Sequence, residues 1–511
     1  MSNVTDEMST TPADPGRSTP PGMPPGAMSY SARIYELAAE RAYANALVFV
    51  GLDGSEQLWS WRRLADRSTQ IARSLRQHGV AHGDRVGIKI RNSPEHIAVA
   101  LACYHAGAVP VPVRWDLPDW ELQRVFEVLD AKLVVELDHA AITESAADST
   151  EPLADLVSPN ASGIMSSGST GTPKVILRVP PGMYVPGASA NRLVEAYGGL
   201  GPQLLLVPAP LYHNNGFMAI GNLFGGDRLL LLERFDPTAV LAAIERHGVT
   251  GVVATTVMLQ RLARDESFDT RDLSSLEWVM HGAAPLPEWL ARQWIERVGP
   301  DRFYVCYGSS EGAGATFARG DEYLEHPGTV GKGAMATELK ILDDDQHELP
   351  TGEVGHVYLK AADGLLTSYV GNVAPIPTTP DGYVTVGDLG SLDDDGYLYL
   401  ADRRVDMIVS GGANVYPAEV EAALSEHPEV ADVVVIGLSD PEWGRRVHAI
   451  VQRAAGSTID ADTLRAYARE RLAPYKTPKT VEFVDSISRS EATKLNRAAL
   501  VAERDGATQK A

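Results

Sequence analysis

Short hydrophobic runs alternate with amphipathic segments from about residue 30 to residue 307. The runs at 85–90 and 203–207 have the length of buried strands, and the helical patterns at 95–105 and 237–246 each end at a glycine. Strands that alternate with helices favour parallel sheets covered by helices. The same alternation predicts further strands at 109–113, 132–137, 228–232, 249–255, 277–280 and 302–307, and further helices at 119–129, 258–264 and 288–297.

The pattern changes after about residue 330, where short strand-like runs are separated by turns rich in Asp and Gly, such as 343–345 and 393–396. Such turns predict hairpins, and therefore a β-rich subdomain over about 330–403. A helix at 417–424, strands at 433–436 and 449–452 and a helix at 461–471 then predict a small α+β unit. The expected fold class is α/β, with a large N-terminal domain of parallel-type sheets, helices and the β-rich subdomain, and a small mobile C-terminal domain.

Three segments follow from these patterns. Residues 1–28 are rich in Pro, Gly, Ser and Thr and offer too little hydrophobic surface to order themselves, so we expect a disordered tail. Residues 29–403 form the expected N-terminal domain and residues 404–511 the expected C-terminal domain.

Composition narrows the classes of partner. The 511 residues include 45 Lys and Arg against 67 Asp and Glu, a formal charge of −22, which argues against nucleic acids and anionic membranes as partners. Two isolated cysteines, Cys103 and Cys306, fit a reducing compartment. No secretory signal or membrane-spanning run is present in the sequence, so we expect a soluble cytoplasmic protein.

A stretch of small and hydroxylated residues ends in a lysine at Ser166–Lys174. Small side chains let backbone N–H groups converge on an anion, the hydroxyls add donors and the lysine adds a positive charge. It is not a Walker loop, because Pro173 precedes the lysine and Val175 follows it.

This stretch resembles the phosphate-loop signature of the acyl-adenylate-forming superfamily, which comprises acyl-CoA synthetases, adenylation domains of peptide synthetases and firefly-type luciferases. Four further motifs, in the family's order, strengthen the resemblance, which covers about 30–505 and is closest to acyl-CoA synthetases. They lie at 307–311, at 381–388, at 402–421 and at 490–497. Departures include Ser310 where the family has Thr, and Val405 at the usual hinge position.

The resemblance implies an ATP site. The phosphates would be held by Ser166, Ser167, Gly168, Ser169, Thr170, Gly171 and Lys174. Glu311 would bind Mg²⁺ and Ser310 would contact the α-phosphate. The nucleoside would meet Gly282, Ala283, Ala284, Pro285 and Tyr307 at the adenine, and Asp388 and Arg403 at the ribose.

The resemblance also assigns a catalytic lysine, Lys494, which would bridge the substrate carboxylate, the ribose ring oxygen and the α-phosphate. A carboxylate that approaches a phosphate is an anion approaching an anion, so a fixed cation offsets the growing charge. The C-terminal domain would then have to move before a thiol can reach the adenylate.

The acid site is expected around His213, an aromatic residue of the family's Pro-Leu-(Tyr/Phe)-His motif that would move between the two half-reactions. No Asp stands nearby to pair with a substrate ammonium, so we expect an acid without an α-amino group. Pocket candidates are Asn214, Asn215, Gly216, Phe217, His281 and Gly312. The small residues either leave room for a bulky acid or only shape turns.

CoA is the preferred acyl acceptor, with a carrier protein as the alternative. The positions implied to line the pantetheine tunnel are Gly411, Gly412 and Trp443, and Lys476 would meet a CoA phosphate, as could Arg445 and Arg446.

One alternative belongs to another class. Gly308–Gly312 also fits the G-x-S-x-G nucleophile elbow of α/β-hydrolases, with Ser310 as nucleophile and Asp388 and His448 following in the right order. The elbow requires a helix directly after the serine, which the glycines at 312 and 314 disfavour. It also leaves the phosphate-loop stretch and Lys494 without a role.

Overall fold

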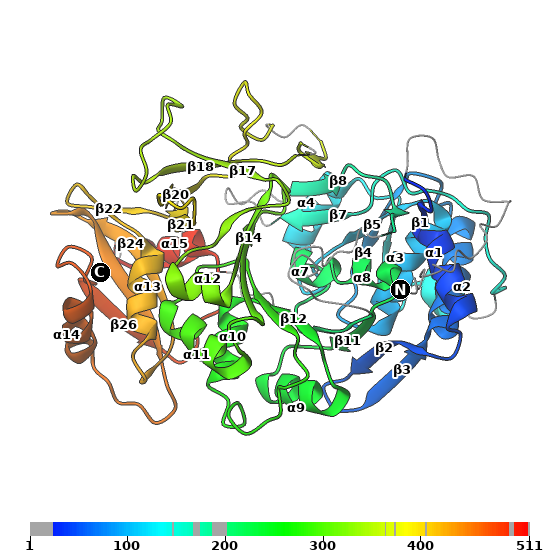
Figure 1. The fold of residues 1–511 in the computed structure, drawn as a ribbon, viewed down its shortest axis with the longest axis horizontal. Coiled ribbons are helices and arrows are strands. Elements are labelled where there is room, and N and C mark those ends of the chain that lie inside the picture. Colours follow the sequence, from blue (N-terminus) through cyan, green and yellow to red (C-terminus); the bar gives the residue numbers. More distant parts are fainter. Residues whose placement is uncertain are drawn as a thin grey trace, which may run out of the picture.

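A nine-stranded sheet forms the centre of the N-terminal domain (Figure 1). The computed structural model describes residues 24–145, 148–166, 174–186, 202–362, 364–371, 375–403, 406–489 and 495–508. In spatial order the strands are β16 (Lys332–Ala334), β15 (Ala315–Arg319), β14 (Phe303–Gly308), β13 (Trp278–His281), β12 (Gly251–Ala254), β10 (Leu204–Val207), β11 (Arg228–Leu232), β2 (Asn45–Val50) and β3 (Glu56–Ser60). Strands β14 to β2 run parallel, and the others are antiparallel at the two edges, as the alternating pattern predicts.

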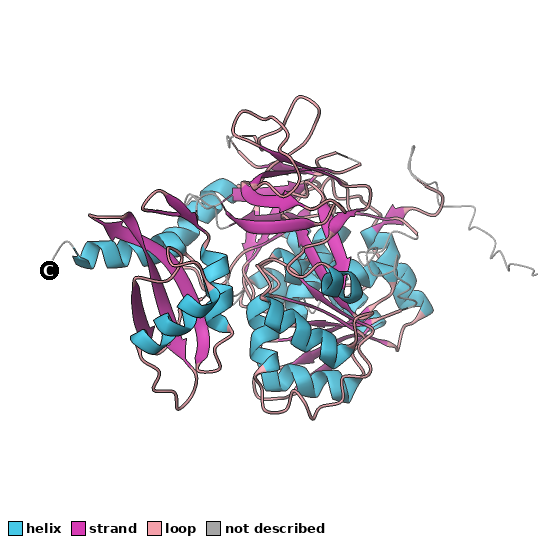
Figure 2. Cartoon of the chain, turned by 60° about the vertical axis from the view of Figure 1, so that its left-hand side comes forward, coloured by secondary structure: helices cyan, strands magenta, loops and turns pink. Residues whose placement is uncertain are grey.

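Helices cover both faces of this sheet (Figure 2). In β10, Leu205 and Val207 belong to one hydrophobic cluster, while Leu204 and Leu206 belong to another. Because successive side chains of a strand point to opposite faces, a strand covered on both sides is an unbroken hydrophobic run. The first cluster includes residues of α1 (Tyr30–Glu40), α2 (Trp61–Gln77), α3 (Pro94–Ala106) and α8 (Ile220–Gly225), and the second includes residues of α9 (Pro237–His247), α10 (Thr256–Ala263) and α11 (Glu288–Val298).

Local signals set the ends of these helices. Ser93 caps α3 by accepting a hydrogen bond from the His96 N–H, Pro94 opens the helix and Gly107 closes it at a φ of 72°. Asp236, Pro237 and Gly248 do the same for α9. Proline at the first turn and a left-handed glycine after the last turn are the preferred helix boundaries, so the sequence predicts both helices to within one residue at each end.

Smaller sheets flank the central one. They pair β5 (Val109–Pro112), β4 (Arg85–Ile88) and β6 (Leu133–Val135), then β19 (Thr367–Tyr369), β8 (Lys174–Arg178) and β7 (Gly163–Ser166), and β1 (Met28–Ser29) with β9 (Met183–Tyr184). Helices α4 (Asp119–Leu129), α5 (Ala140–Thr143), α7 (Asn214–Phe217) and α12 (Gly320–Glu325) also belong to the described part of this half.

The folded chain begins earlier than the expected tail boundary. Met28 pairs with Tyr184 in β1, and Ala27 is 6% exposed. Ala27 and Met28 are therefore packed on the folded part, whereas residues 24–26 are exposed. Residues 1–23, the rest of the expected tail, lie outside the described residues.

The β-rich subdomain is an antiparallel sheet of β17 (Glu338–Leu342), β18 (Gly355–Lys360), β20 (Asp388–Leu392) and β21 (Leu398–Arg403). Its β20–β21 turn is organised by Asp393, whose side chain accepts hydrogen bonds from the backbone of Asp395 and Tyr397. Between β18 and β20 the chain leaves this sheet, and β19 pairs with β8, which begins at Lys174. The sequence patterns do not predict this excursion.

The C-terminal domain stands beside the N-terminal domain as a separate group of strands and helices (Figure 2) and has its own hydrophobic core. It contains β22 (Ile408–Ser410), β23 (Ala413–Val415), α13 (Pro417–Ser425), β24 (Val430–Asp440), β25 (Gly444–Arg453), α14 (Ala461–Arg471), β26 (Thr480–Val484) and α15 (Arg497–Thr508). The α+β expectation is confirmed. The expected boundary falls at residues 404 and 405, which lie outside the described residues, as does the hinge candidate Val405. Among the described helices, none has the length and hydropathy to cross a bilayer.

Candidate active site

A cavity of about 2570 Å³ opens between the two domains. From the N-terminal domain it is lined by the ends of β8, β13 and β14 and by the loop before β20, including Lys174, Glu311 and Asp388. From the C-terminal domain it is lined by residues of α13, β24 and α15, together with Leu495 and Asn496. Residues far apart in the chain therefore share one space.

One end of the cavity gathers Lys174, Tyr369 and Glu311. The Lys174 ammonium lies 5.0 Å from the centre of the Tyr369 ring, and the Tyr369 hydroxyl donates to Glu311 Oε1 at 3.3 Å. Burial, and then the Glu311 charge, raises the pKa of Tyr369 to about 12, so the phenol keeps its proton and remains a donor. The β19–β8 pairing brings these residues together. Tyr369 was missed by sequence reasoning because its role depends on that pairing.

Most of the expected phosphate loop lies outside the described residues, namely Ser167, Gly168, Ser169, Thr170 and Gly171. The backbones at its two ends are described, and Ser166 pairs with Lys174 across β7 and β8. The β7–β8 hairpin therefore connects to both ends of the loop, and its Lys174 lies near Tyr369.

Most of the expected nucleoside residues line another part of the cavity, namely Gly282, Ala283, Ala284, Pro285, Tyr307 and Asp388. Tyr307, at the end of β14, donates its hydroxyl to Asp388 Oδ2 at 2.7 Å, and Asp388 is 8% exposed. Ala283 has a φ of 74°, a left-handed conformation that costs a residue with a Cβ about 1 kcal/mol or more. Such strain concentrates at binding sites. Arg403 lies opposite Asp388 in the β20–β21 register.

The hydrolase alternative is wrong. After β14, Gly312 N–H donates back to Ser309 O in a tight turn, and the chain then enters β15, antiparallel to β14, instead of a helix. Ser310 therefore lacks the helix that a nucleophile elbow requires. His448 lies in β25 of the C-terminal domain, hydrogen-bonded to Thr480 and Glu482.

The residues expected to bind the acid substrate divide into those that line the cavity and those that do not. His213, Asn214, Asn215, His281 and Gly312 line the cavity. His281 bonds Thr256 Oγ1 at 2.9 Å, and burial lowers its pKa to about 3, so it is neutral near pH 7.

Two expected pocket residues do not line the cavity. Phe217 is 3% exposed and belongs to the hydrophobic core. A Cβ on Gly216 would lie 2.2 Å from Pro210 O, so this glycine is needed for close backbone packing. Of the two interpretations of the small residues, the shaping of a turn is the correct one for Gly216, because its missing side chain allows close backbone packing and does not enlarge the cavity.

The catalytic-lysine candidate, Lys494, lies outside the described residues. The residues that follow it, Leu495 and Asn496, line the cavity. Arg497 binds both carboxylate oxygens of Glu421, at 2.8 and 2.9 Å, which anchors the start of α15 to α13.

Of the CoA candidates, Arg445 lines the cavity, whereas Gly411, Gly412, Trp443, Arg446 and Lys476 do not in this arrangement of the domains. Gly411 and Gly412 form the β22–β23 turn, and a Cβ on Gly411 would lie 2.6 Å from the Trp443 ring. Lys476 Nζ binds both carboxylate oxygens of Glu419, at 2.6 and 2.7 Å. Its charge is thus held in an ion pair on the C-terminal domain.

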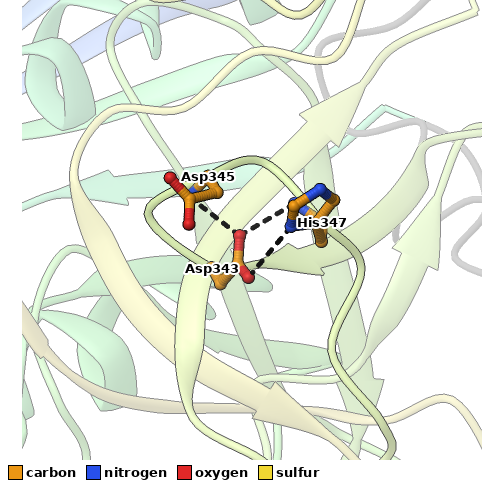
Figure 3. Close-up of side chains that lie close together, drawn as sticks. All are labelled: Asp343, Asp345 and His347. Atoms are coloured by element: carbon orange, nitrogen blue, oxygen red, sulfur yellow. Dashed lines mark hydrogen bonds and ion pairs between the residues drawn. The ribbon is translucent and has the colours of Figure 1, made fainter.

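A group of possible metal ligands, Asp343, Asp345 and His347, lies in the loop after β17 (Figure 3). Asp343 Oδ1 accepts from the backbone N–H groups of Asp345 and His347, at 2.9 and 2.8 Å, and Asp343 Oδ2 lies 3.4 Å from His347 Nδ1. These hydrogen bonds within the turn explain why the three side chains lie close together, so we do not assign a metal site to them.

Comparison with known proteins places this geometry in a family. Residues 35–370 match the family described as AMP-binding enzyme, and residues 419–494 match the AMP-binding enzyme C-terminal domain. A feruloyl-CoA synthase from Amycolatopsis is 33% identical over 449 residues, which cover 84% of this chain and 90% of the relative. A 2-succinylbenzoate–CoA ligase from Bacillus velezensis is 32% identical over 460 residues, which cover 86% and 92%.

The solved structure of o-succinylbenzoate CoA synthetase from Bacillus subtilis, in complex with its acyl-adenylate intermediate, is similar with a TM-score of 0.78 at 27% identity. The match covers 93% of this chain and 98% of that one. The chain belongs to the AMP-binding enzyme family. The resemblance, the fold class and the predicted enzyme class, an AMP-forming acid–thiol ligase, are confirmed.

Proposed function

We propose that this protein activates a carboxylic acid with MgATP to an acyl-adenylate and transfers the acyl group to CoA, releasing AMP and pyrophosphate. The observation that carries the proposal is the convergence in one cavity of Lys174, Glu311 with Tyr369, and Tyr307 with Asp388. The related CoA ligases support the reaction, and the Bacillus subtilis enzyme has been solved with ATP and a magnesium ion.

In the first half-reaction a carboxylate oxygen attacks the α-phosphorus, and pyrophosphate leaves. Lys174 would hold the leaving phosphates, and Asp388 would accept from the ribose hydroxyls. The Glu311 carboxylate, steadied by the Tyr369 hydroxyl, is an oxygen donor of the kind that Mg²⁺ prefers. When bound there, the ion would neutralise charge on the pyrophosphate.

The proposed roles of the two domains differ. The N-terminal domain, expected over residues 29–403, would bind ATP and the acid. The C-terminal domain would bring Lys494 to the α-phosphate and then move, so that Gly411, Gly412 and Trp443 can flank the thiol of CoA. Alignment of the reactants supplies much of the rate, because the protein does little covalent chemistry.

The acid is proposed to be bulky, without an α-amino group, and aromatic in part. Feruloyl-CoA synthase and 2-succinylbenzoate–CoA ligase, the relatives named above, act on such acids. A reaction that depends on ATP and CoA is proposed to take place in the cytoplasm.

The test is a panel of aryl and polycyclic acids in a pyrophosphate-release assay, with and without CoA. Acid-dependent release is expected, with an acyl-CoA product when CoA is present. In Lys494→Ala the rate of pyrophosphate release should fall by several orders of magnitude. The variant should still convert a supplied acyl-adenylate to the thioester with CoA. Equal loss in both half-reactions would contradict the role of Lys494. Thioester formation on a carrier protein and not on CoA would favour the alternative acceptor.

A further inference from the structure

Arg178 brings a guanidinium to the acid end of the cavity. It ends β8, the strand that begins at Lys174, and it lines the cavity beside Asn214 and Gly312. Its Nη2 donates to Asn214 Oδ1 at 3.1 Å, and a Cβ built on Gly312 would lie 3.5 Å from its Nη1. Sequence reasoning did not single out this residue, because an arginine at a strand end is usually solvated.

The charge of Arg178 is poorly compensated. Within the described part of the chain no carboxylate forms an ion pair with it, and its buried Nε–H has no hydrogen-bond acceptor. Glu311 acts on it only through space, while burial lowers the pKa of the guanidinium. A partly buried cation without a close counter-charge is costly, which favours an anionic partner from outside the chain.

Glu311 cannot be that partner during the proposed reaction, because its carboxylate would be occupied by Mg²⁺. Asn214, like Arg178, favours an anionic ligand. Its Oδ1 accepts from Arg178, which fixes the orientation of the amide and leaves Nδ2 as a donor with no acceptor among the described residues. Arg178 and Asn214 thus present N–H donors to one region, and a guanidinium matches the planar fork of a carboxylate.

We propose that Arg178 and Asn214 form a subsite for a second carboxylate on the acid substrate, distant from the carboxylate that is adenylated. The substrate class is therefore a dicarboxylic acid with an aryl or similarly bulky skeleton. The inference rests on the proposed function, since it names the acid that the same cavity activates.

The test compares two acids of one skeleton, 3-phenylpropanoate and 3-(2-carboxyphenyl)propanoate, in the pyrophosphate-release assay. The wild-type protein should favour the dicarboxylate in kcat/KM by about ten- to hundred-fold, the usual range for a charge-assisted hydrogen bond. Arg178→Gln should remove this preference by raising KM for the dicarboxylate, while the values for the monocarboxylate stay within about three-fold.

Arg114→Gln is the matched control. Arg114 also lines the cavity, but it pairs with Asp116 at 2.6 Å, so its loss should not change the preference between the two acids. Asn214→Asp should abolish the preference, because a carboxylate at 214 would neutralise Arg178 from within the protein. Equal preference in the wild type, or an equal loss on both acids in Arg178→Gln, would overturn the proposal and assign Arg178 to the support of Glu311.

Calorimetric titration of the dicarboxylate without ATP separates this subsite from the proposed function. If no acid releases pyrophosphate, the proposed function fails, and binding that is present in the wild type and lost in Arg178→Gln still supports the subsite. Absence of binding to the wild-type protein would overturn the subsite whatever the assay shows.

Discussion

The hydrogen bond between Tyr307 and Asp388 joins two residues that are 81 positions apart, each at one end of a strand. Asp388 is 8% exposed, so its carboxylate needs donors in the folded protein, and Tyr307 supplies one at 2.7 Å. The sequence motifs indicate both residues, but they assign them to the adenine and the ribose separately. The structure adds that the tyrosine positions the carboxylate.

Tyr307→Phe keeps the ring and removes this donor. We expect the Kd for a non-hydrolysable ATP analogue to rise by about ten-fold, because the carboxylate loses a fixed hydrogen bond. Isothermal titration calorimetry measures it. Tyr304→Phe is the control, since Tyr304 lies on the same strand but donates to Asp301 O. Equal weakening in the two variants would show that the Asp388 contact is not the cause.

At the scale of elements, α3 is buried almost all round, with Glu95 as its one partly exposed residue. It carries two histidines inside the first hydrophobic cluster. His105 contacts Ser31 Oγ at 2.7 Å through Nδ1 and Ser68 Oγ at 3.0 Å through Nε2. Burial lowers the pKa of His105 to about 3 and that of His96 to about 4, so both are neutral in the folded protein.

Acid should therefore destabilise the protein before its carboxylates titrate. In the unfolded chain these histidines bind protons below about pH 6.5, whereas in the fold they do not, so the free energy of unfolding falls as the pH drops. Each contributes up to about 1.4 kcal/mol per pH unit below that point. Urea denaturation at about pH 7 and pH 5 measures the slope.

His105→Gln is the control for this slope. Glutamine does not titrate, so the variant should take up about one proton fewer on unfolding. It should be less stable at neutral pH, but its free energy of unfolding should fall less steeply as the pH drops. An unchanged slope would show that His105 is not among the groups that take up protons on unfolding.

On the scale of the whole molecule, polar contacts between described residues join the C-terminal domain to α10 and α11 of the N-terminal domain. Arg264, which follows α10, donates to Ser425 O at 3.1 Å and to Ala431 O, and Trp289 Nε1 donates to Ser425 Oγ at 3.3 Å. This is the arrangement in which Leu495 and Asn496 line the cavity. Contacts of this kind hold one arrangement without preventing another, as a domain that moves requires.

Arg264→Ala should slow adenylate formation by about ten-fold, because the arrangement in which Leu495 and Asn496 line the cavity loses two hydrogen bonds. Thioester formation from a supplied acyl-adenylate should not slow. Rapid-quench measurement of the two half-reactions tests this. Arg261→Ala, at an exposed position in the last turn of α10, is the control. A uniform loss in both half-reactions would contradict the role of this interface.

The sequence by itself determined the strand–helix order, the helix ends at Gly107 and Gly248, and the family, because short-range patterns and motif order record them directly. It also singled out Lys174, Glu311, Tyr307 and Asp388 as candidate site residues, and all four line one cavity. The tertiary structure alone decided how these residues meet. Contacts between distant segments determine the β19–β8 pairing, the core position of Phe217 and the exposure of Arg178 to the cavity. A local sequence pattern does not specify which distant segment will cover a side chain, so it could not predict these features.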